Sequence, residues 1–406
     1  HKHTILFYPT MERKISPYLA ITIFTLAHSI HHIYAILIPP LLPIFKLVYH
    51  LTYFQAGLLI SLFNIGLINQ LLVGVYSDKK QKRKIFVGLG LVFSAFLVVI
   101  VGLTETFLTL AIIVFLLGIV ASTYHPPGTT LVTEYFPPQK RGRFLGIHLI
   151  GGSTGTALGP ILIGGLATYL GWKHSLYLLS IPGILIGLTY LTLIKDIAMN
   201  RKQPNLTNLE NITDFPANFQ LKEIITSIII LFLALFLGLI PIIGLQSFLT
   251  LYLTDTFNLN ISFAAMLLGL MQIAGILSSP IGGWISDKTG RKPIIVFSLT
   301  IQLVLVYLLL QTSPGIPMYG ILFLLGFFFY ALLPAASAYL ADITPPRLRG
   351  TIYAIYFTAS FGWIAFIQLL TGNLIDILGF KNTFKTLTLT AFGGVVLSLL
   401  IKHRRI

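Results

Sequence analysis

The sequence predicts an all-α membrane protein of twelve transmembrane helices in two six-helix pseudo-repeated bundles. Of the 406 residues, 55% are hydrophobic and only 10% are charged, whereas roughly a quarter of the residues of a soluble domain are charged. The charged residues gather in short clusters between apolar runs of about 20 residues or more, the length at which a helix crosses a hydrocarbon core about 30 Å thick. Loop motifs of the first half also recur in the second half.

The apolar runs give the order of the spans and divide the chain in two. The polar stretch 196–223 is expected to be a cytoplasmic linker between a six-helix bundle at 1–195 and another at 224–406. The first apolar segment lacks a small-residue cleavage site, so we interpret it as a retained span and not a signal peptide. The expected spans lie at roughly 16–45, 53–76, 85–103, 107–135, 144–170, 175–195, 224–254, 261–286, 294–312, 318–342, 351–378 and 384–402.

The basic residues predict the orientation of these spans. The net charge is +15, but Lys and Arg are spread through many short loops instead of one face, which argues against nucleic acid as a partner. Only Lys46, Lys173, Lys381 and Lys385 of the 27 Lys and Arg fall on one side, leaving 23 on the other. By the positive-inside rule, the chain is a multi-pass protein of the inner (plasma) membrane with both termini cytoplasmic. There is no cysteine, which excludes disulfides, thiol catalysis and cysteine metal sites.

The loops reveal an internal duplication. Residues 134–142, Glu-Tyr-Phe-Pro-Pro-Gln-Lys-Arg-Gly, resemble residues 342–350, Asp-Ile-Thr-Pro-Pro-Arg-Leu-Arg-Gly, at an offset of 208 that Gly171 and Gly379 share. The sequence Gly-x-x-x-Asp-Lys at 74–79 recurs at 283–288, displaced by 209. A parallel duplication of six helices predicts a substrate site midway between the halves.

These loops resemble those of the major facilitator superfamily over nearly the whole chain. Residues 283–292 are similar to the loop signature of that family, whereas the first copy has Gln81 in place of its second glycine. The resemblance implies charged latches that lock one conformation, as charge-assisted pairs do. The alternative is a set of topology-setting surface charges, each pair contributing about 0–1 kcal/mol. The implied latches join Asp78 to Arg141 or Arg143, and Asp287 to Arg349, with Arg291 as the neighbouring basic residue of the signature.

The fifth span is rich in glycine and resembles the glycine–proline signature of proton antiporters. Gly146, Gly155, Gly159-Pro160 and Gly164-Gly165 follow the pattern, although three residues precede the last glycine pair where the family has two. The resemblance implies antiport. Close packing of a bent helix explains the same glycines without it.

Histidines in the first and fourth spans are the most specific signal. His28, His31 and His32 share one helix face with Tyr34 following, and His125 lies beside a double proline. This pattern is similar to the fosmidomycin-resistance branch, which exports drug-like compounds, but that branch has an aspartate where this chain has His32. An ionisable group in a span is a functional candidate that carries protons or binds substrate, and a structural hydrogen bond is the alternative.

We expect these histidines to couple transport to protons. No acidic residue lies at mid-depth in any span, so transport is predicted to depend on His32 and on pH, with a midpoint between about 5.5 and 7.5. For want of a cysteine or acidic partner at that depth, we expect no metal and no cofactor.

A cavity for a moderately polar organic molecule is also expected. No Lys or Arg falls deep in a span, which disfavours sugar phosphates and dicarboxylates. Each polar side chain alone is compatible with simple helix packing. The candidate lining residues are Asn64, Gln70, Ser153, Thr154, Gln246, Gln272, Tyr330, Tyr356, Trp363 and Gln368.

The sequence therefore predicts a monomeric secondary transporter that exports drug-like compounds by proton antiport, with a small molecule, protons and the lipid bilayer as partners. Import of a metabolite or metal chelate is the alternative. An enzyme is not expected, because no nucleophile–base pair or metal-ligand signature of known spacing is present.

Overall fold

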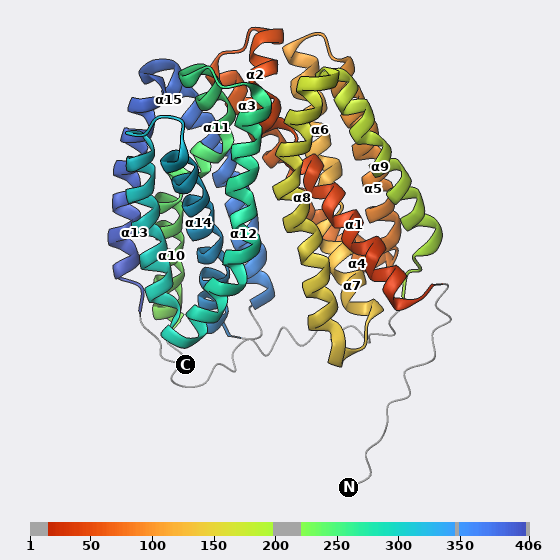
Figure 1. The fold of residues 1–406 in the computed structure, drawn as a ribbon. Coiled ribbons are helices and arrows are strands. Elements are labelled where there is room, and N and C mark those ends of the chain that lie inside the picture. Colours follow the sequence, from red (N-terminus) through yellow and green to blue (C-terminus); the bar gives the residue numbers. More distant parts are fainter. Residues whose placement is uncertain (1–14, 198–220, 346–348, 403–406) are drawn as a thin grey trace.

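The computed structural model describes residues 15–197, 221–345 and 349–402, and within these ranges the chain is helical without strands (Figure 1). The first half contains α1 (Pro17–Ala35), α2 (Ile38–Tyr49), α3 (Tyr53–Leu67), α4 (Gln70–Lys80), α5 (Arg83–Leu103), α6 (Phe107–Ala121), α7 (His125–Tyr135), a 3-10 turn (Pro138–Lys140), α8 (Arg141–Leu170) and α9 (Trp172–Leu193). The second half contains α10 (Leu221–Gly238), α11 (Ile240–Phe257), α12 (Ile261–Thr289), α13 (Arg291–Leu309), α14 (Ile316–Ile343) and α15 (Arg349–Leu399).

The number of spans agrees with the prediction. Eleven segments of the described chain are long and apolar enough to cross a membrane, and the last of them runs through Gly379. This glycine has a φ of 71°, a left-handed conformation that glycine adopts without the steric cost of a Cβ atom, and it breaks α15 into two helices. The described residues therefore hold twelve spans, which confirms the predicted fold. The expected linker lies mostly at 198–220, outside the described residues.

Four of the predicted single spans are each built from two helices, and three of these breaks are followed by proline; the fourth separates α3 from α4. α1 gives way to α2, α6 to α7 and α10 to α11, and each second helix begins with proline in its first turn. Proline lacks a backbone N–H, which costs nothing at a position where the N–H has no partner within the helix. Pro39, Pro126 and Pro241 thus explain breaks that the apolar pattern alone does not predict.

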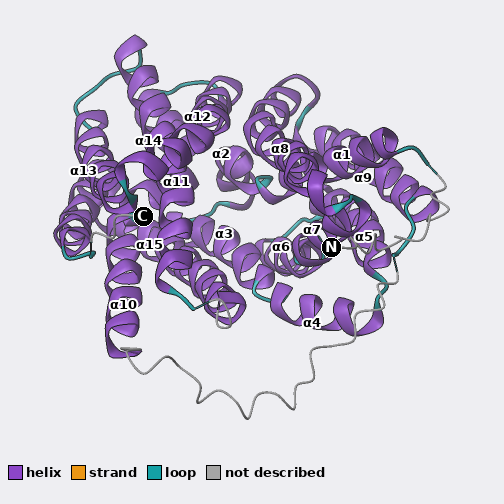
Figure 2. Ribbon diagram, turned by 90° about the horizontal axis from the view of Figure 1, so that it is seen from below, coloured by secondary structure: helices purple, strands orange, loops and turns teal. Residues whose placement is uncertain are grey.

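The two bundles stand side by side (Figures 1 and 2) and meet through α3 with α15 and through α8 with α12. Small residues allow the close approach. A Cβ atom on Gly57 would lie 2.4 Å from the carbonyl oxygen of Gln368, and one on Gly372 would lie 2.3 Å from that of Tyr53. Gly164, which is 208 residues before Gly372, packs in the same way against Ala265 of α12. The two interfaces therefore come from one duplicated contact.

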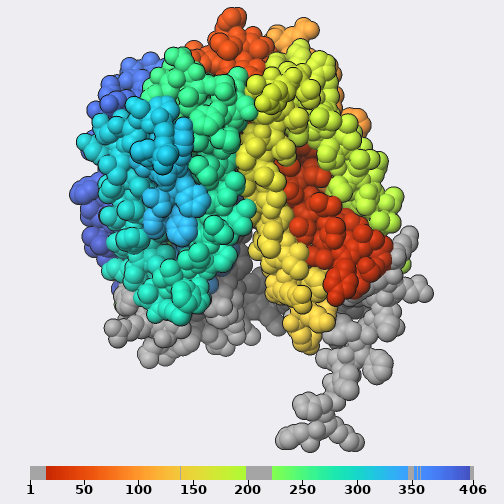
Figure 3. All heavy atoms as spheres, viewed as in Figure 1, coloured from red at the N-terminus to blue at the C-terminus, as the bar shows by residue number. Residues whose placement is uncertain are grey.

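Polar contacts between the halves concentrate at one end of the molecule. Lys46 Nζ lies 2.6 Å from a carboxylate oxygen of Asp255, and the Asp376 carboxylate accepts hydrogen bonds of 2.9 and 2.7 Å from the backbone N–H groups of Tyr53 and Phe54. We call this end the outer end, and the opposite end, where α8 begins at Arg141, the inner end. Figure 3 shows the halves touching at the outer end and diverging toward the inner end.

Candidate functional site

A cavity of about 440 Å³ lies between the two halves. The first half contributes α1, α2, α3 and α7, and the second contributes α10, α11, α12, α14 and α15. Most of the lining is aliphatic or aromatic, including Phe63, Phe236 and Phe329. Among the described residues that line it, none is Lys, Arg, Asp or Glu. The cavity therefore suits a mainly apolar solute with a few hydrogen-bonding groups.

Amides and hydroxyl groups connect the halves across the cavity wall. Asn64 Nδ2 donates to Gln368 Oε1 at 3.1 Å, and Gln368 Nε2 donates in turn to Ser247 Oγ at 3.2 Å. Gln246 also lines the cavity, and its Nε2 is buried without a hydrogen-bond partner among the described residues. Because a buried donor without a partner is costly, Gln246 is available to a bound solute.

The histidines form one cluster on the first-half wall. The ring centroids of His28 and His32 are 4.8 Å apart, those of His31 and His125 are 4.7 Å apart, and His28 stacks on His148 of α8 at 4.2 Å. Glycines of α8 make room for them, since a Cβ atom on Gly152 would lie 2.6 Å from the ring of His28. Gly151, Gly152 and Gly155 of the fifth span thus serve the packing of α8 against α1, whereas Gly164 meets α12.

Hydrogen bonds fix the orientation of these rings. His28 Nδ1 lies 2.8 Å from the carbonyl oxygen of His148, and His32 Nδ1 lies 2.8 Å from Thr156 Oγ1. His31 and His125 approach each other through their Nε2 atoms at 3.2 Å. His31, His32 and His125 line the cavity, whereas His28 lies behind them.

Several residues expected at the site lie elsewhere. The Tyr34 hydroxyl donates to the carbonyl oxygen of Leu179 at 2.9 Å, so this side chain holds α1 against α9 and does not line the cavity. Tyr330 donates to Gln272 from behind the wall. Gln70, Ser153 and Thr154 are absent from the lining as well; on α8, glycines occupy the face that meets α1. The cavity does contain Asn64, Gln246, Gln272, Tyr356, Trp363 and Gln368.

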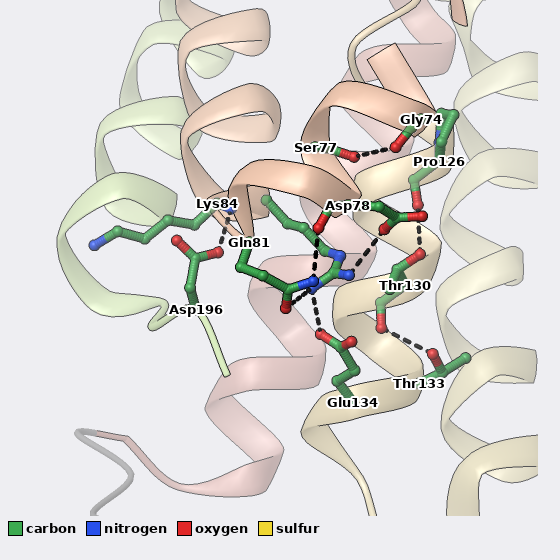
Figure 4. Close-up of polar contacts among 11 residues, drawn as sticks. Gly74, Ser77, Asp78, Gln81, Lys84, Pro126, Thr130, Thr133, Glu134 and Asp196 are labelled. Carbon is green, nitrogen blue, oxygen red and sulfur yellow. Dashed lines mark hydrogen bonds and ion pairs between the residues drawn. The ribbon is translucent and has the colours of Figure 1, made fainter. Parts of the chain in front are cut away.

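At the inner end of the first half, Arg83 bridges two acidic side chains. Its guanidinium lies 2.8 Å from Asp78 and 3.1 Å from Glu134, and the Arg83 and Glu134 side chains are only 5% and 4% exposed. Figure 4 shows the acidic residues gathered around this position, with Gln81 beside them. Nearby, the Asp196 carboxylate accepts a 2.7 Å hydrogen bond from the backbone N–H of Lys84. Burial raises the pKa of the Asp196 carboxyl, and the hydrogen bond from Lys84 partly offsets this rise.

The second half repeats this arrangement. Arg291 bridges Asp287 and Asp342, the latter at 3.1 Å. Lys84 Nζ donates to the carbonyl oxygen of Leu191 at 3.2 Å, and Lys292 Nζ donates to that of Leu399 at 2.6 Å. Each of these residues of the second half follows its counterpart by 208 positions, except that Asp287 follows Asp78 by 209.

The expected latch pairs differ from the ion pairs that the structure contains. Asp78 binds Arg83 instead of Arg141 or Arg143, because Arg83 lies only five positions later, across the short turn between α4 and α5. Arg141 donates to the carbonyl oxygen of Phe136. Asp287 likewise binds Arg291, and the Arg349 side chain lies outside the described part of the chain. The loop at Gln81 turns differently from its counterpart, as its missing glycine suggested: Gln81 has a φ of 51° and ends α4, and Lys82 precedes α5.

The sequence interpretation also missed participants. His148 and Thr156 contact the histidines from α8, and Ser247 binds the cavity amide Gln368. A histidine in the fifth span was a visible signal for His148. Thr156 and Ser247 gave none, because hydroxyl residues are common in packed membrane helices.

A duplicated helical bundle with a cavity between its halves has the architecture of a secondary transporter. The chain belongs to the Major Facilitator Superfamily, whose sequence profile matches residues 24–367 and 231–405. It is thus a multi-pass membrane protein of a transporter family.

Three curated relatives cover most of the chain. An uncharacterized MFS-type transporter of Bacillus subtilis, YfnC, is 24% identical, with 96% of this chain and 94% of the relative covered. The fosmidomycin resistance protein of Escherichia coli is 23% identical, with 94% and 92% covered. A probable hexose phosphate transport protein of Chlamydia pneumoniae is 24% identical, with 84% and 80% covered.

A solved structure shows the same fold. The crystal structure of a bacterial homologue of the human lysosomal transporter Spinster, in an inward-facing and occupied conformation, superimposes with a TM-score of 0.79 at 16% identity. The match covers 95% of this chain and 97% of that chain.

Proposed function

We propose that this protein exports a small organic solute through the inner membrane by alternating access, driven by protons. The single observation that carries the choice of solute is the cavity of about 440 Å³, whose described lining is apolar and amide-rich and includes no Lys, Arg, Asp or Glu. A solute with an aromatic or aliphatic body and one or two hydrogen-bond acceptors fits this lining. Gln246, with its unpartnered Nε2, is the proposed donor to it.

The same lining argues against a phosphorylated sugar as the solute. Recognition of phosphate uses guanidinium or ammonium groups, and the described cavity offers only imidazoles as possible cations. Of the relatives, the fosmidomycin resistance protein therefore supports the proposal better than the hexose phosphate transport protein does. Import of a metabolite or metal chelate is a second candidate, which the histidine cluster favours.

Alternating access is proposed from the unequal contacts of the two ends. The described polar contacts that join the halves lie at the outer end and at the cavity, whereas a Cβ atom on Gly142 or Gly146 of α8 would meet nothing within 4 Å. If the positive-inside rule holds, the inner end is cytoplasmic and both termini lie in the cytoplasm. The structure then corresponds to the state that is open to the cytoplasm. The proposed transporter is a monomer. Rocking of its two halves against each other would open the outer end.

Transport assays in proteoliposomes test the proposal. Inside-out vesicles should accumulate an uncharged aromatic compound from a panel when a pH gradient is imposed, and Gln246→Leu should weaken this accumulation. Hexose phosphate should not be accumulated. Accumulation of hexose phosphate, or uptake indifferent to the pH gradient for every compound, would contradict the proposed solute and the proposed coupling respectively.

A further inference from the structure

We propose that His28, His32 and His125 form a binding site for a divalent transition-metal ion. Each offers one ring nitrogen as a ligand, and the three nitrogens lie within 4.8 Å of one another. Three histidines and one open position are an established coordination set for zinc. The proposal departs from the sequence-based expectation of no metal. It concerns binding and does not depend on the direction or the coupling of transport.

The hydrogen bonds of the cluster place a bare lone pair on His28. A carbonyl oxygen can only accept a hydrogen bond, so His28 Nδ1, 2.8 Å from the carbonyl oxygen of His148, carries the proton of a neutral ring. Its Nε2 is then an acceptor. This atom is buried without a hydrogen-bond partner among the described residues, and the His28 side chain as a whole is only 4% exposed. A buried acceptor without a protein partner is available to coordinate a metal ion.

The same reasoning applies to His32. The Thr156 hydroxyl has one hydrogen, which it donates to the carbonyl oxygen of Gly152 at 3.0 Å. His32 Nδ1 therefore donates to Thr156 Oγ1 at 2.8 Å, and His32 Nε2 presents its lone pair. A metal-bound histidine generally donates its second ring N–H to a carbonyl or another oxygen in this way. His148 and Thr156 are thus the positioning residues of the proposed site.

The donor set selects the class of ion. Imidazole suits Zn²⁺, Cu²⁺ and Ni²⁺, whereas Mg²⁺ and Ca²⁺ prefer carboxylate and carbonyl oxygens. Ligand nitrogens about 2.0–2.1 Å from a tetrahedral ion lie about 3.4 Å apart, so binding draws the three rings together by roughly 1 Å. His32 and His125 line the cavity, which places the open coordination position toward it. Since no described acidic residue lines the cavity, water or a hydrogen-bonding group of a small molecule would be the fourth ligand.

Metal binding to the purified full-length protein, carrying a histidine-free affinity tag, tests this site. Co²⁺ alone should give the visible absorption of a tetrahedral nitrogen-ligated ion at one equivalent, and Zn²⁺ should displace it, at about pH 7.5 where free imidazole is neutral. Thr156→Ala should weaken Zn²⁺ binding about tenfold, as loss of such a partner does in other sites. His32→Ala and His125→Ala should each weaken it further. His174→Ala, an exposed histidine at the outer end, is the matched control and should bind as the original protein does.

Two results would overturn the site. One is the absence of Co²⁺ and Zn²⁺ binding to the original protein, whose fold is not in question. The other is binding that survives in both His32→Ala and His125→Ala, or that is lost in His174→Ala, since the ion would then be held elsewhere. Elution as a single species in detergent shows that each variant is folded. If His125→Ala does not fold, His125→Gln takes its place.

Discussion

At the inner end, the two halves hold the same three contacts. Arg83 and Arg291 each bind an aspartate of their own loop and an acidic residue of a neighbouring helix, and Lys84 and Lys292 each cap a helix carbonyl. Around the cavity the halves differ, because the first contributes histidines and the second contributes glutamines and aromatic rings. Contacts that hold each bundle together have thus kept their chemistry after duplication, whereas the residues that line the cavity have diverged.

The repeated contacts are also unequal in burial. Glu134 is 4% exposed, but its counterpart Asp342 is 34% exposed. Loss of one partner from a buried ion pair leaves an uncompensated charge in an apolar surrounding, whereas an exposed charge is solvated by water. The ion pairs of Arg83 should therefore contribute more to stability than those of Arg291. The first prediction below tests this difference in stability, and the next ones test the contacts between the two halves.

The largest effect is expected for Arg83→Ala. Removal of this guanidinium takes away the positive charge that neutralises the buried Glu134 carboxylate. It should lower the free energy of unfolding by about 3–5 kcal/mol. Arg291→Ala should cost about 1 kcal/mol, because Asp287 and Asp342 are better solvated. Thermal unfolding in detergent measures the difference. Lys82→Ala, an exposed neighbour of Arg83, serves as the control; equal losses in the two arginine variants would refute the inequality.

The next effect concerns the interface between α3 and α15. Gly57→Ala brings a Cβ atom to 2.4 Å from the Gln368 carbonyl oxygen, a backbone atom that cannot move aside, and should destabilise the outer contact by about 1–3 kcal/mol. Spin labels at Lys173→Cys and Lys381→Cys, site-specific because the chain has no cysteine, should then report longer distances across the outer end. Gly320→Ala, where nothing lies within 4 Å, should leave the distances unchanged. An unchanged distance in Gly57→Ala would contradict the inference that the close approach of α3 and α15 holds the outer end together.

A smaller effect is expected for Asp376→Asn. The carboxylate accepts from two backbone N–H groups at the start of α3, where a negative charge is also favoured by the helix dipole. The amide keeps one acceptor oxygen and loses the charge, which should weaken the outer contact by about 1 kcal/mol, or about fivefold in the ratio of the two conformations. The same pair of labels measures this ratio, and Asp255→Asn provides the comparison at the other outer contact. A ratio that does not change would show that this cap plays no part in closing the outer end.

The smallest effect concerns pH and Asp196. The raised pKa of this carboxyl means that the folded protein binds its proton more tightly than the unfolded chain does, so its contribution favours folding at low pH and is lost as pH rises above its ordinary pKa of 3.8. Asp196→Asn should therefore remove part of the decline in thermal stability in the acidic window above about pH 4. Stability curves of the two proteins that run parallel through this window would show that the carboxyl does not contribute.

The spans and their duplication could be predicted from the sequence, because a bilayer imposes length and hydrophobicity on every helix. Asn64, Gln246 and Gln368, which the sequence analysis expected at a cavity, lie in the lining of the one between the halves, since deep polar residues tend to face the bundle interior. The same reasoning placed Ser153 and Thr154 at the cavity, although neither residue lines it. Which face of α8 meets α1 depends on its glycines, and the sequence alone does not say which neighbour each glycine approaches.

The ion pairs were harder to predict. Loop charges occur close together in sequence, and several pairings satisfy the same spacing. The side chain of Arg83 reaches Asp78 and Glu134 only because α4, α5 and α7 converge at the inner end (Figure 4). The tautomers of His28 and His32 were likewise beyond sequence reasoning, since they depend on a carbonyl oxygen and a hydroxyl group of α8.

The lysine caps have a consequence for assembly. Lys84 ties the start of α5 to the end of α9, and Lys292 ties the start of α13 to the end of α15, so each contact closes one bundle upon itself. Neither contact involves the opposite bundle. The smallest unit that a cell must complete during synthesis is then six helices, and two separate genes, one for each bundle, should suffice to make the protein. Such fragments, ending after Ile197 and starting before Leu221, should find each other in the membrane through the glycine contacts of α3 and α8.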